Sequence, residues 1–191
     1  MSPSAKGHPP DSAPGLLEIL FEHNLWATAA LLDDAARLAP GALQRRFEIG
    51  PGSIHDTLRH IIGAMLRWAD RVGERPLRPS IERDERARTV AELRELLERA
   101  DAELREVVAR VVADGRLGEP MEIREADPVY RFTRAAAVLH VLTHGERHRA
   151  QILNMRRQLG LPALELDLNV LEWECAPAQR PAQPPAAECG A

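Results

Sequence analysis

The sequence has little of several features that would place it in a class at once. Only 4% of its 191 residues are aromatic, and its two cysteines, Cys175 and Cys189, lie near the C-terminus without a CxxC spacing. Two late thiols exclude a disulfide framework. No segment approaches the roughly 20 apolar residues of a membrane helix, and residues 1–14 lack the apolar stretch of a secretory signal. We therefore expect a cytoplasmic protein with no membrane partner.

A basic excess is also missing. The chain has 25 lysines and arginines against 29 acidic residues, a formal net charge of −4, and Lys6 is its only lysine. Nucleic-acid-binding proteins usually carry a basic excess or a basic stripe. The composition therefore argues against a nucleic-acid partner.

The sequence does contain enough apolar material for one core. Hydrophobic residues make up 45% of the chain, which suits one domain with tails better than two domains. Residues 1–14 and 175–191 are rich in Pro, Ala, Ser or Gln and show no apolar periodicity, so we expect both to be flexible tails. The predicted globular domain covers residues 15–174.

Helical periodicity dominates this domain. Ser53, Thr89 and Thr133 have the character of helix N-caps, and Pro40 is expected to stop the first helix. The predicted long helices cover residues 16–38, 53–73, 89–113 and 133–159. Residues 121–124 read as a short strand or extended loop, and residues 167–174 as a short last helix. Four amphipathic helices of similar length predict an all-α four-helix bundle, whose long connections allow crossovers.

The last long helix carries three histidines at intervals of four residues, His140, His144 and His148. Four residues advance a helix by a net 40°, so the three imidazoles line one stripe. The apolar side of the helix lies close to His148, which directs His144 and His148 inward and leaves His140 at the margin. Two imidazoles one turn apart can converge on one metal ion.

A pair of histidines needs a further ligand from another helix. His60 is the best-placed donor, at the edge of the apolar face of its helix, and His23 is a second possible one, although spacing alone does not choose between them. His55 is rotated by 140° from His60 on the same helix. The alternative interpretation is structural, since histidine pairs at this spacing also occur in surface and core packing without a metal.

The segments around these histidines resemble a known family. The run from His140 to Ile152, followed by Arg157 to Pro162, resembles the closing signature of the DinB-like (damage-inducible) metal-binding proteins. Residues 53–61 with Trp68 resemble the second-helix signature of that family, and residues 24–27 resemble its first-helix signature. Order and separations agree over about residues 16–173.

The resemblance implies a bundle with one divalent transition metal ion, such as zinc, nickel or iron, on His60, His144 and His148. It implies for His140 a packing role beside the ligands. The sequence departs from the family pattern at His23, where tyrosine is frequent, at Thr143, where asparagine is common, and at Ala150, where glycine is common. The departure at His23 concerns the pocket wall and therefore the substrate.

The resemblance also implies a function. Related proteins include thiol-dependent transferases and isomerases that use low-molecular-weight bacterial thiols. We therefore expect a metal-dependent enzyme that acts on a small molecule, with a thiol as cosubstrate and a metal site at the mouth of the bundle. The alternative is a non-catalytic, metal-stabilised bundle that serves as a stress-response binding module or forms a homodimer.

Overall fold

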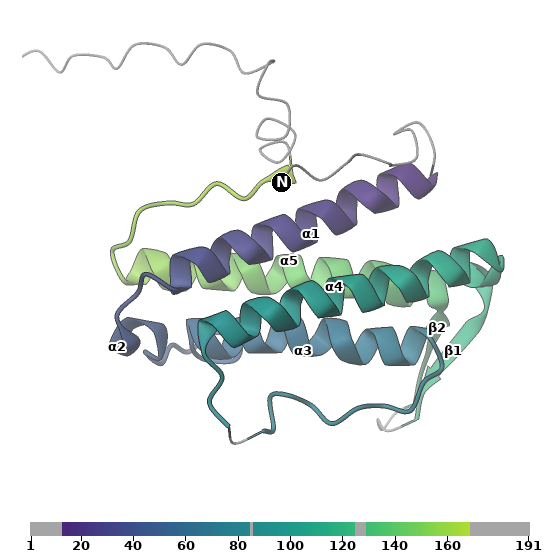
Figure 1. Cartoon of the computed structure of the whole chain (residues 1–191), viewed down its shortest axis with the longest axis horizontal. Coiled ribbons are helices and arrows are strands. Elements are labelled where there is room, and N and C mark those ends of the chain that lie inside the picture. The colour runs from purple at the N-terminus through teal and green to yellow at the C-terminus, as the bar shows by residue number, and fades with distance from the viewer. Residues whose placement is uncertain (1–12, 85, 125–128, 169–191) are drawn as a thin grey trace, which may run out of the picture.

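The computed structural model describes residues 13–84, 86–124 and 129–168. Its long helices are α1 (Ala13–Ala35), α3 (Ile54–Val72), α4 (Val90–Ala113) and α5 (Arg134–Gln158). The shorter elements are α2 (Pro40–Leu43), the 3-10 turn η1 (Arg116–Gly118), and the strands β1 (Pro120–Ile123) and β2 (Tyr130–Thr133). The predicted all-α bundle is confirmed (Figure 1).

Three of the long helices begin at the predicted caps. The hydroxyl of Ser53 accepts a hydrogen bond from the Asp56 amide at 3.0 Å, and Thr89 forms a capping box with Glu92. The Thr133 hydroxyl accepts a hydrogen bond from the amide of residue 136, three residues later, at 3.2 Å. These side chains satisfy backbone N–H groups that have no partner within the helix, and so fix the residue at which each helix starts.

The connections differ from the prediction in two places. The first helix ends at Ala35, before Pro40, and this proline begins α2 because its fixed φ suits the first position of a helix. The second difference is β2, which the sequence did not reveal and which pairs antiparallel with β1, Met121 lying opposite Phe132. β1 itself falls where a strand or an extended loop was expected.

The four long helices form a square in which α1 and α3 lie on one diagonal. Each of these two packs against both α4 and α5, so α4 and α5 occupy the other two corners (Figure 1). Contacts between helices show their directions: Glu18 with Arg105 and Asp33 with Arg94 join antiparallel α1 and α4, and Asn24 with Arg149 and Asp34 with Arg156 join parallel α1 and α5.

Helices α3 and α4 also run parallel, so residues 73–84 and 86–89 return along the bundle as a crossover connection (Figure 1). His55 near the start of α3 lies 2.7 Å from the carbonyl of Arg88, which precedes α4, and Gly73 at the end of α3 lies against Val107. A crossover, which the long connections allow, is therefore present, and it passes beside α3.

A buried polar cross-link fixes α5 against α1. Arg149 donates to Asn24 at 2.7 Å and to Thr28 at 3.2 Å, and its other terminal nitrogen donates to Glu146 at 2.7 Å. The approach is close because residue 145 is glycine: a Cβ there would lie 2.6 Å from Asn24 Oδ1 and 3.0 Å from Arg149 Nη1.

Some predictions fall outside the described residues. The tails 1–14 and 175–191 lie outside them apart from residues 13 and 14, and so does the expected last helix apart from residues 167 and 168. None of the described helices combines the length and apolar character that a membrane crossing demands.

Candidate metal site

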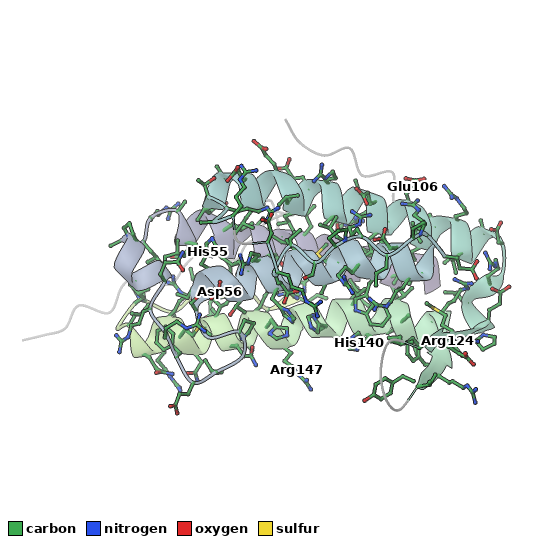
Figure 2. All side chains as sticks on the ribbon, turned by 90° about the horizontal axis from the view of Figure 1, so that it is seen from below. His55, Asp56, Glu106, Arg124, His140 and Arg147 are labelled. Carbon is green, nitrogen blue, oxygen red and sulfur yellow. The ribbon has the colours of Figure 1, made fainter. Side chains whose placement is uncertain are left out.

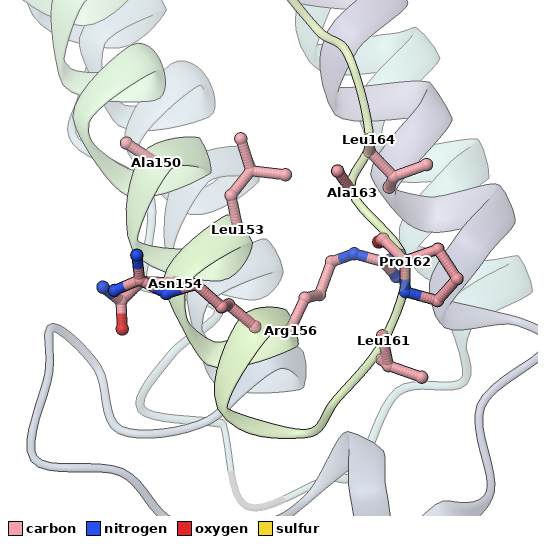
Figure 3. Close-up of a pocket in the computed structure, with 9 residues that line it drawn as sticks. Ala150, Leu153, Asn154, Arg156, Leu161, Pro162, Ala163 and Leu164 are labelled. Atoms are coloured by element: carbon pink, nitrogen blue, oxygen red, sulfur yellow. The ribbon is translucent and has the colours of Figure 1, made fainter.

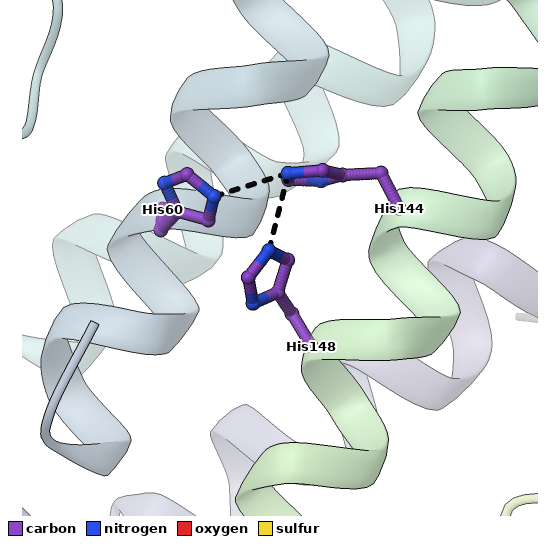
Figure 4. A group of neighbouring side chains, drawn as sticks. All are labelled: His60, His144 and His148. Carbon is purple, nitrogen blue, oxygen red and sulfur yellow. Dashed lines mark hydrogen bonds between the residues drawn. The ribbon is translucent and has the colours of Figure 1, made fainter. Parts of the chain in front are cut away.

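Three histidines from two helices meet between α3 and α5. His60 lies in the second turn of α3, and His144 and His148 lie one turn apart on α5 (Figure 4). The stripe on α5 predicted from the spacing faces α3, since His144 lies against His60 and the ring of His140 lies 5.0 Å from that of Trp68. The phase of His60 follows from the Ser53 cap, which fixes where α3 begins.

The meeting point is formed by Nε2 atoms. His144 Nε2 lies 3.0 Å from His60 Nε2 and 3.1 Å from His148 Nε2, as the dashed lines in Figure 4 indicate. The three ligand nitrogens all lie within 4.8 Å of one another, and among the described residues no further His, Cys, Asp or Glu joins the group. This is the geometry of imidazoles that share one small central species.

The opposite ring nitrogens of two histidines are held by acceptors. His60 Nδ1 donates to Glu82 Oε2 at 2.8 Å, and His148 Nδ1 donates to Gln151 Oε1 at 2.7 Å. A neutral imidazole carries one proton, so a proton on Nδ1 leaves a lone pair on Nε2. His60 and His148 therefore both present lone pairs to the centre of the group.

These hydrogen bonds leave the group incompletely satisfied. His144 Nε2 can donate its single proton to only one of the two lone pairs beside it. His144 Nδ1 is buried and has no hydrogen-bond partner among the described residues. A divalent cation at the centre would accept lone pairs from all three rings, and imidazole nitrogen is a ligand that zinc, nickel, iron and copper accept. The residues present therefore fit a metal ion.

The electrostatics favour the neutral form of His144 and His148, the state in which imidazole binds a metal. Burial, reinforced by the neighbouring imidazoles, lowers the pKa of His144 to about 3. Burial also lowers the pKa of His148. For Glu82, burial alone would raise the pKa, but the hydrogen bond from His60 and the charge of Arg59 outweigh it and hold that pKa below its usual range.

The remaining described histidines lie outside the group. His23 was an alternative third donor, but its Nε2 lies 2.6 Å from the carbonyl of Leu166, between α1 and the segment after α5. His55 is bound to the carbonyl of Arg88, as its different direction on the helix suggested. His140 is exposed on α5. It lies nearer to the start of that helix than Arg147 does (Figure 2).

An aromatic row leads away from the three histidines. The ring of His140 lies 5.6 Å from that of His144 and 5.0 Å from that of Trp68 on α3, and Phe132 on β2 lies 6.0 Å from Trp68. The row borders the seam between α3 and α5 and ends at the hairpin. His140 therefore takes the neighbouring position that the resemblance implied.

A hollow of about 380 Å³ lies elsewhere, between the end of α5 and the segment that follows it (Figure 3). Its lining includes Asn154, Arg157 and Pro162 but no histidine. The chemistry of the three imidazoles and this hollow are therefore separate features of the molecule.

Sequence reasoning missed Glu82 and Gln151, the two partners of the imidazoles. Gln151 was open to detection, because it lies three residues after His148 and so shares its helix face. Glu82 lies in a polar connection with no periodicity, and nothing in its local sequence distinguishes it from the other acidic residues there.

Comparison with known proteins agrees with the fold and the motifs. Residues 4–182 match the model of the DinB family. The chain belongs to the DinB family. It is also 24% identical over 152 residues to Protein DinB of Bacillus subtilis (strain 168), an alignment that covers 78% of this chain and 88% of that protein.

Membership of the DinB family confirms the resemblance drawn from the histidine-bearing segments. The matched region includes His60, His144 and His148, and it extends beyond the predicted domain of residues 15–174 at both ends. The ligand role of the three histidines stays a prediction, supported by the convergence of their Nε2 atoms.

Proposed function

We propose that this DinB-family protein is a metal-dependent enzyme of a small molecule, of the thiol S-transferase or isomerase type. One divalent transition metal ion, such as zinc, nickel or iron, would be held by His60, His144 and His148. The observation that carries this proposal is the convergence of three Nε2 atoms, two of which present lone pairs fixed by bonds at the opposite nitrogen.

The number of ligands favours a reactive site over a purely structural one. Structural zinc sites are closed by four protein ligands, whereas catalytic sites use three and leave a position for water or substrate. The group contains three donors among the residues that the structure describes. The His60 side chain keeps 25% of its surface exposed, so a small molecule has a route to the group.

A bound dication would supply a Lewis acid of undiminished charge, since neutral imidazoles do not offset it, and would favour the thiolate form of a thiol or the hydroxide form of water. The chain itself contributes orientation. Glu82 and Gln151 hold protons at Nδ1 of the two rings they contact, and Trp68 with His140 provides an aromatic wall beside the group.

The thiol is proposed as a cosubstrate, not as a residue of the protein. Cys175 and Cys189 are the two cysteines of the chain, and both lie outside the described residues, far along the sequence from the helices that carry the histidines. A low-molecular-weight bacterial thiol would bind at the open position, and an electrophilic small molecule would bind along the aromatic row.

The first test is metal content. Purified protein should contain about one divalent ion per chain, and added zinc or nickel should raise the thermal stability of the metal-free protein by mass action. Absence of metal after gentle purification, together with no thermal shift, would contradict the proposed site.

The second test is activity. We expect the metal-loaded protein to conjugate a bacterial thiol to a monochlorobimane-type electrophile, and we expect no turnover in the metal-free protein.

A second candidate function rests on a different observation. Leu16 and Leu20 on α1 and Leu139 on α5 are 59%, 37% and 51% exposed, and two of them border a largely apolar hollow of about 370 Å³. This surface suits a second copy of the chain, in a bundle where the metal contributes only folding free energy. A metal-dependent gain in thermal stability without turnover, and a dimer that dissociates in Leu139→Glu, would favour this candidate.

A further inference from the structure

The crossover connection between α3 and α4 is tied to the bundle at Arg78. The Arg78 guanidinium donates to both carboxylate oxygens of Asp70, each at 2.7 Å, and to Glu103 of α4 at 2.6 Å. The Asp70 side chain is only 3% exposed, so this ion pair attaches the connection to a buried residue of α3. Arg67 of α3 holds the same point by donating to the Arg78 carbonyl at 3.0 Å.

A second attachment follows four residues later. Arg59, in the turn of α3 that carries His60, donates to the carbonyl of Glu82 at 3.1 Å. This bond fixes the backbone at the residue whose side chain contacts the histidine, so the approach of the Glu82 carboxylate does not depend on that contact alone.

The closest approach of the connection to α3 occurs at Gly63. A Cβ at this position would lie 3.0 Å from Ile81 Cγ1 and 3.3 Å from Glu82 Oε1. Glycine is unfavourable inside a helix, but here it lets the connection lie directly against the helix backbone. Gly63 is one turn beyond His60, so this contact brings Glu82 beside the ring.

We infer that Glu82 is a positioning residue of the metal site, and that residues 73–82 serve as an arm that holds its carboxylate against His60. This inference rests on the proposed metal-binding function. Its basis is the 2.8 Å bond from His60 Nδ1, together with the attachments at Arg78, Arg59 and Gly63 that deliver the carboxylate.

The physical effect acts through the ring. A carboxylate on Nδ1–H fixes the tautomer, orients the imidazole and increases the donor strength of Nε2, and loss of such a partner commonly lowers metal affinity by roughly 10–100-fold. The three rings differ in this respect: His60 has a carboxylate partner, His148 has a neutral amide, and His144 Nδ1 has no hydrogen-bond partner in the part of the chain that the structure describes.

The test uses the full chain with Zn²⁺ and Co²⁺ as probes, and compares wild type, Glu82→Ala and Glu82→Gln. The dissociation constant for Zn²⁺ should rise roughly 10–100-fold in Glu82→Ala. It should rise less in Glu82→Gln, whose amide oxygen still accepts the Nδ1 proton. The visible spectrum of bound Co²⁺ should change in Glu82→Ala, because the orientation of one ligand ring changes.

Asp84→Asn is the matched control. Asp84 lies in the same connection, and its carboxylate pairs with Arg88 at 2.7 Å. This variant removes the same charge and should bind Zn²⁺ with about the wild-type affinity. Unfolding of the metal-free variants in urea should show that Glu82→Ala and Asp84→Asn remain folded.

The arm itself is tested by Gly63→Val, whose side chain would displace Ile81 and Glu82. This variant should weaken Zn²⁺ binding in the wild-type background and should add no further loss in the Glu82→Ala background, since residues that act through one contact are not additive. Full additivity would show that residue 63 acts on the site by another route and would overturn the role of the arm.

The outcomes separate the inference from the proposed function. If wild type binds Zn²⁺ and Glu82→Ala binds it equally well with the same Co²⁺ spectrum, the inference is wrong and the metal site stands. If wild type binds neither ion, the metal site and the inference are both wrong.

Discussion

Helix α5 carries a buried polar group on each of two faces, and the two differ in how they are satisfied. On the face toward α1, Arg149 is only 3% exposed. Both its terminal nitrogens donate to acceptors on Asn24, Thr28 and Glu146, and only its Nε has no hydrogen-bond partner among the described residues. On the face toward α3, the Nε2 atoms of His144, His148 and His60 meet. The Nε2 atom of His144 can donate at most one proton, but it lies beside two lone pairs, one on His60 and one on His148.

The difference separates a structural group from a binding group. Donors that meet acceptors compensate for the cost of their burial and fasten two helices together. Lone pairs that meet lone pairs require a further species between them. The two faces therefore predict opposite results when each is altered, one in stability and the other in metal binding.

The largest expected effect is on the face toward α3. His148→Ala removes one of three donors, so its affinity for Zn²⁺ should fall by more than the roughly 10–100-fold that loss of a ligand's partner causes. Calorimetric titration of the metal-free protein measures this. His140→Ala is the control, because His140 lies outside the group and its loss should change the affinity little. Equal losses in the two variants would contradict the ligand assignment.

The next effect lies on the face toward α1. Arg149→Met leaves Asn24 and Thr28 without their donor, so the free energy of unfolding of the metal-free protein should fall by about 1–3 kcal/mol. Urea denaturation measures this change, with Arg147→Met at the exposed neighbouring position as the control. The zinc stoichiometry should stay at the wild-type value. If Arg149→Met is as stable as the wild type but no longer binds zinc, then Arg149 serves metal binding and not stability, contrary to the comparison.

Acid should act on the histidine face of the metal-free protein. Burial and then the neighbouring imidazoles lower the pKa of His144 to about 3, whereas an unfolded histidine titrates near its ordinary pKa of about 6.5. Above the unfolded pKa, neither state binds the proton. As pH falls from about 6.5 toward about 3, the unfolded chain gains a proton that the folded protein resists, so stability falls.

Unfolding in urea at a series of pH values measures this dependence. The decline between about pH 6.5 and 3 should be shallower in His144→Gln, which has no such proton to exclude. An unchanged slope in that variant would mean that the acid sensitivity comes from other groups.

The smallest effect concerns the amide partner of His148. Gln151→Ala should lower zinc affinity by about tenfold, at the low end of the range for such partners, because a neutral amide strengthens the ring less than a carboxylate does. Competition with a chelator measures it, beside Asn154→Ala, which alters an amide one turn along α5. A larger loss for Gln151→Ala than for Glu82→Ala would contradict this order of the two partners.

Much of the fold followed from local sequence. The caps at Ser53, Thr89 and Thr133 were predictable because a side chain bonded to its own backbone acts within one turn. The stripe of histidines on α5 was predictable for the same reason, since helix geometry alone places residues at intervals of four on one side. The strand β2 was not predictable, because it exists through pairing with β1 and has no strong pattern of its own.

Helix geometry alone predicted only part of the site. Spacing paired His144 with His148, and helix position favoured His60 as the third donor without excluding His23. The family resemblance then implied His60. The choice depends on which helix packs against α5 on that side and in which direction it runs, which is tertiary information. The position of the Glu82 side chain depends on two further tertiary features, the crossover direction of its connection and the close approach to α3 that glycine at position 63 permits.

The crossover topology also determines when the site can form. His60 and His144 are separated by 84 positions in the chain, and α3 and α5 are joined through α4 and the hairpin. Contacts between such distant segments require closure of a long loop, and form late in comparison with local helix formation. During synthesis from the N-terminus, α3 therefore emerges well before its partner, and a complete set of three imidazoles exists only after α5 has docked. Metal would then bind only after the bundle is complete, so the rate of metal binding during refolding would measure the last step of folding.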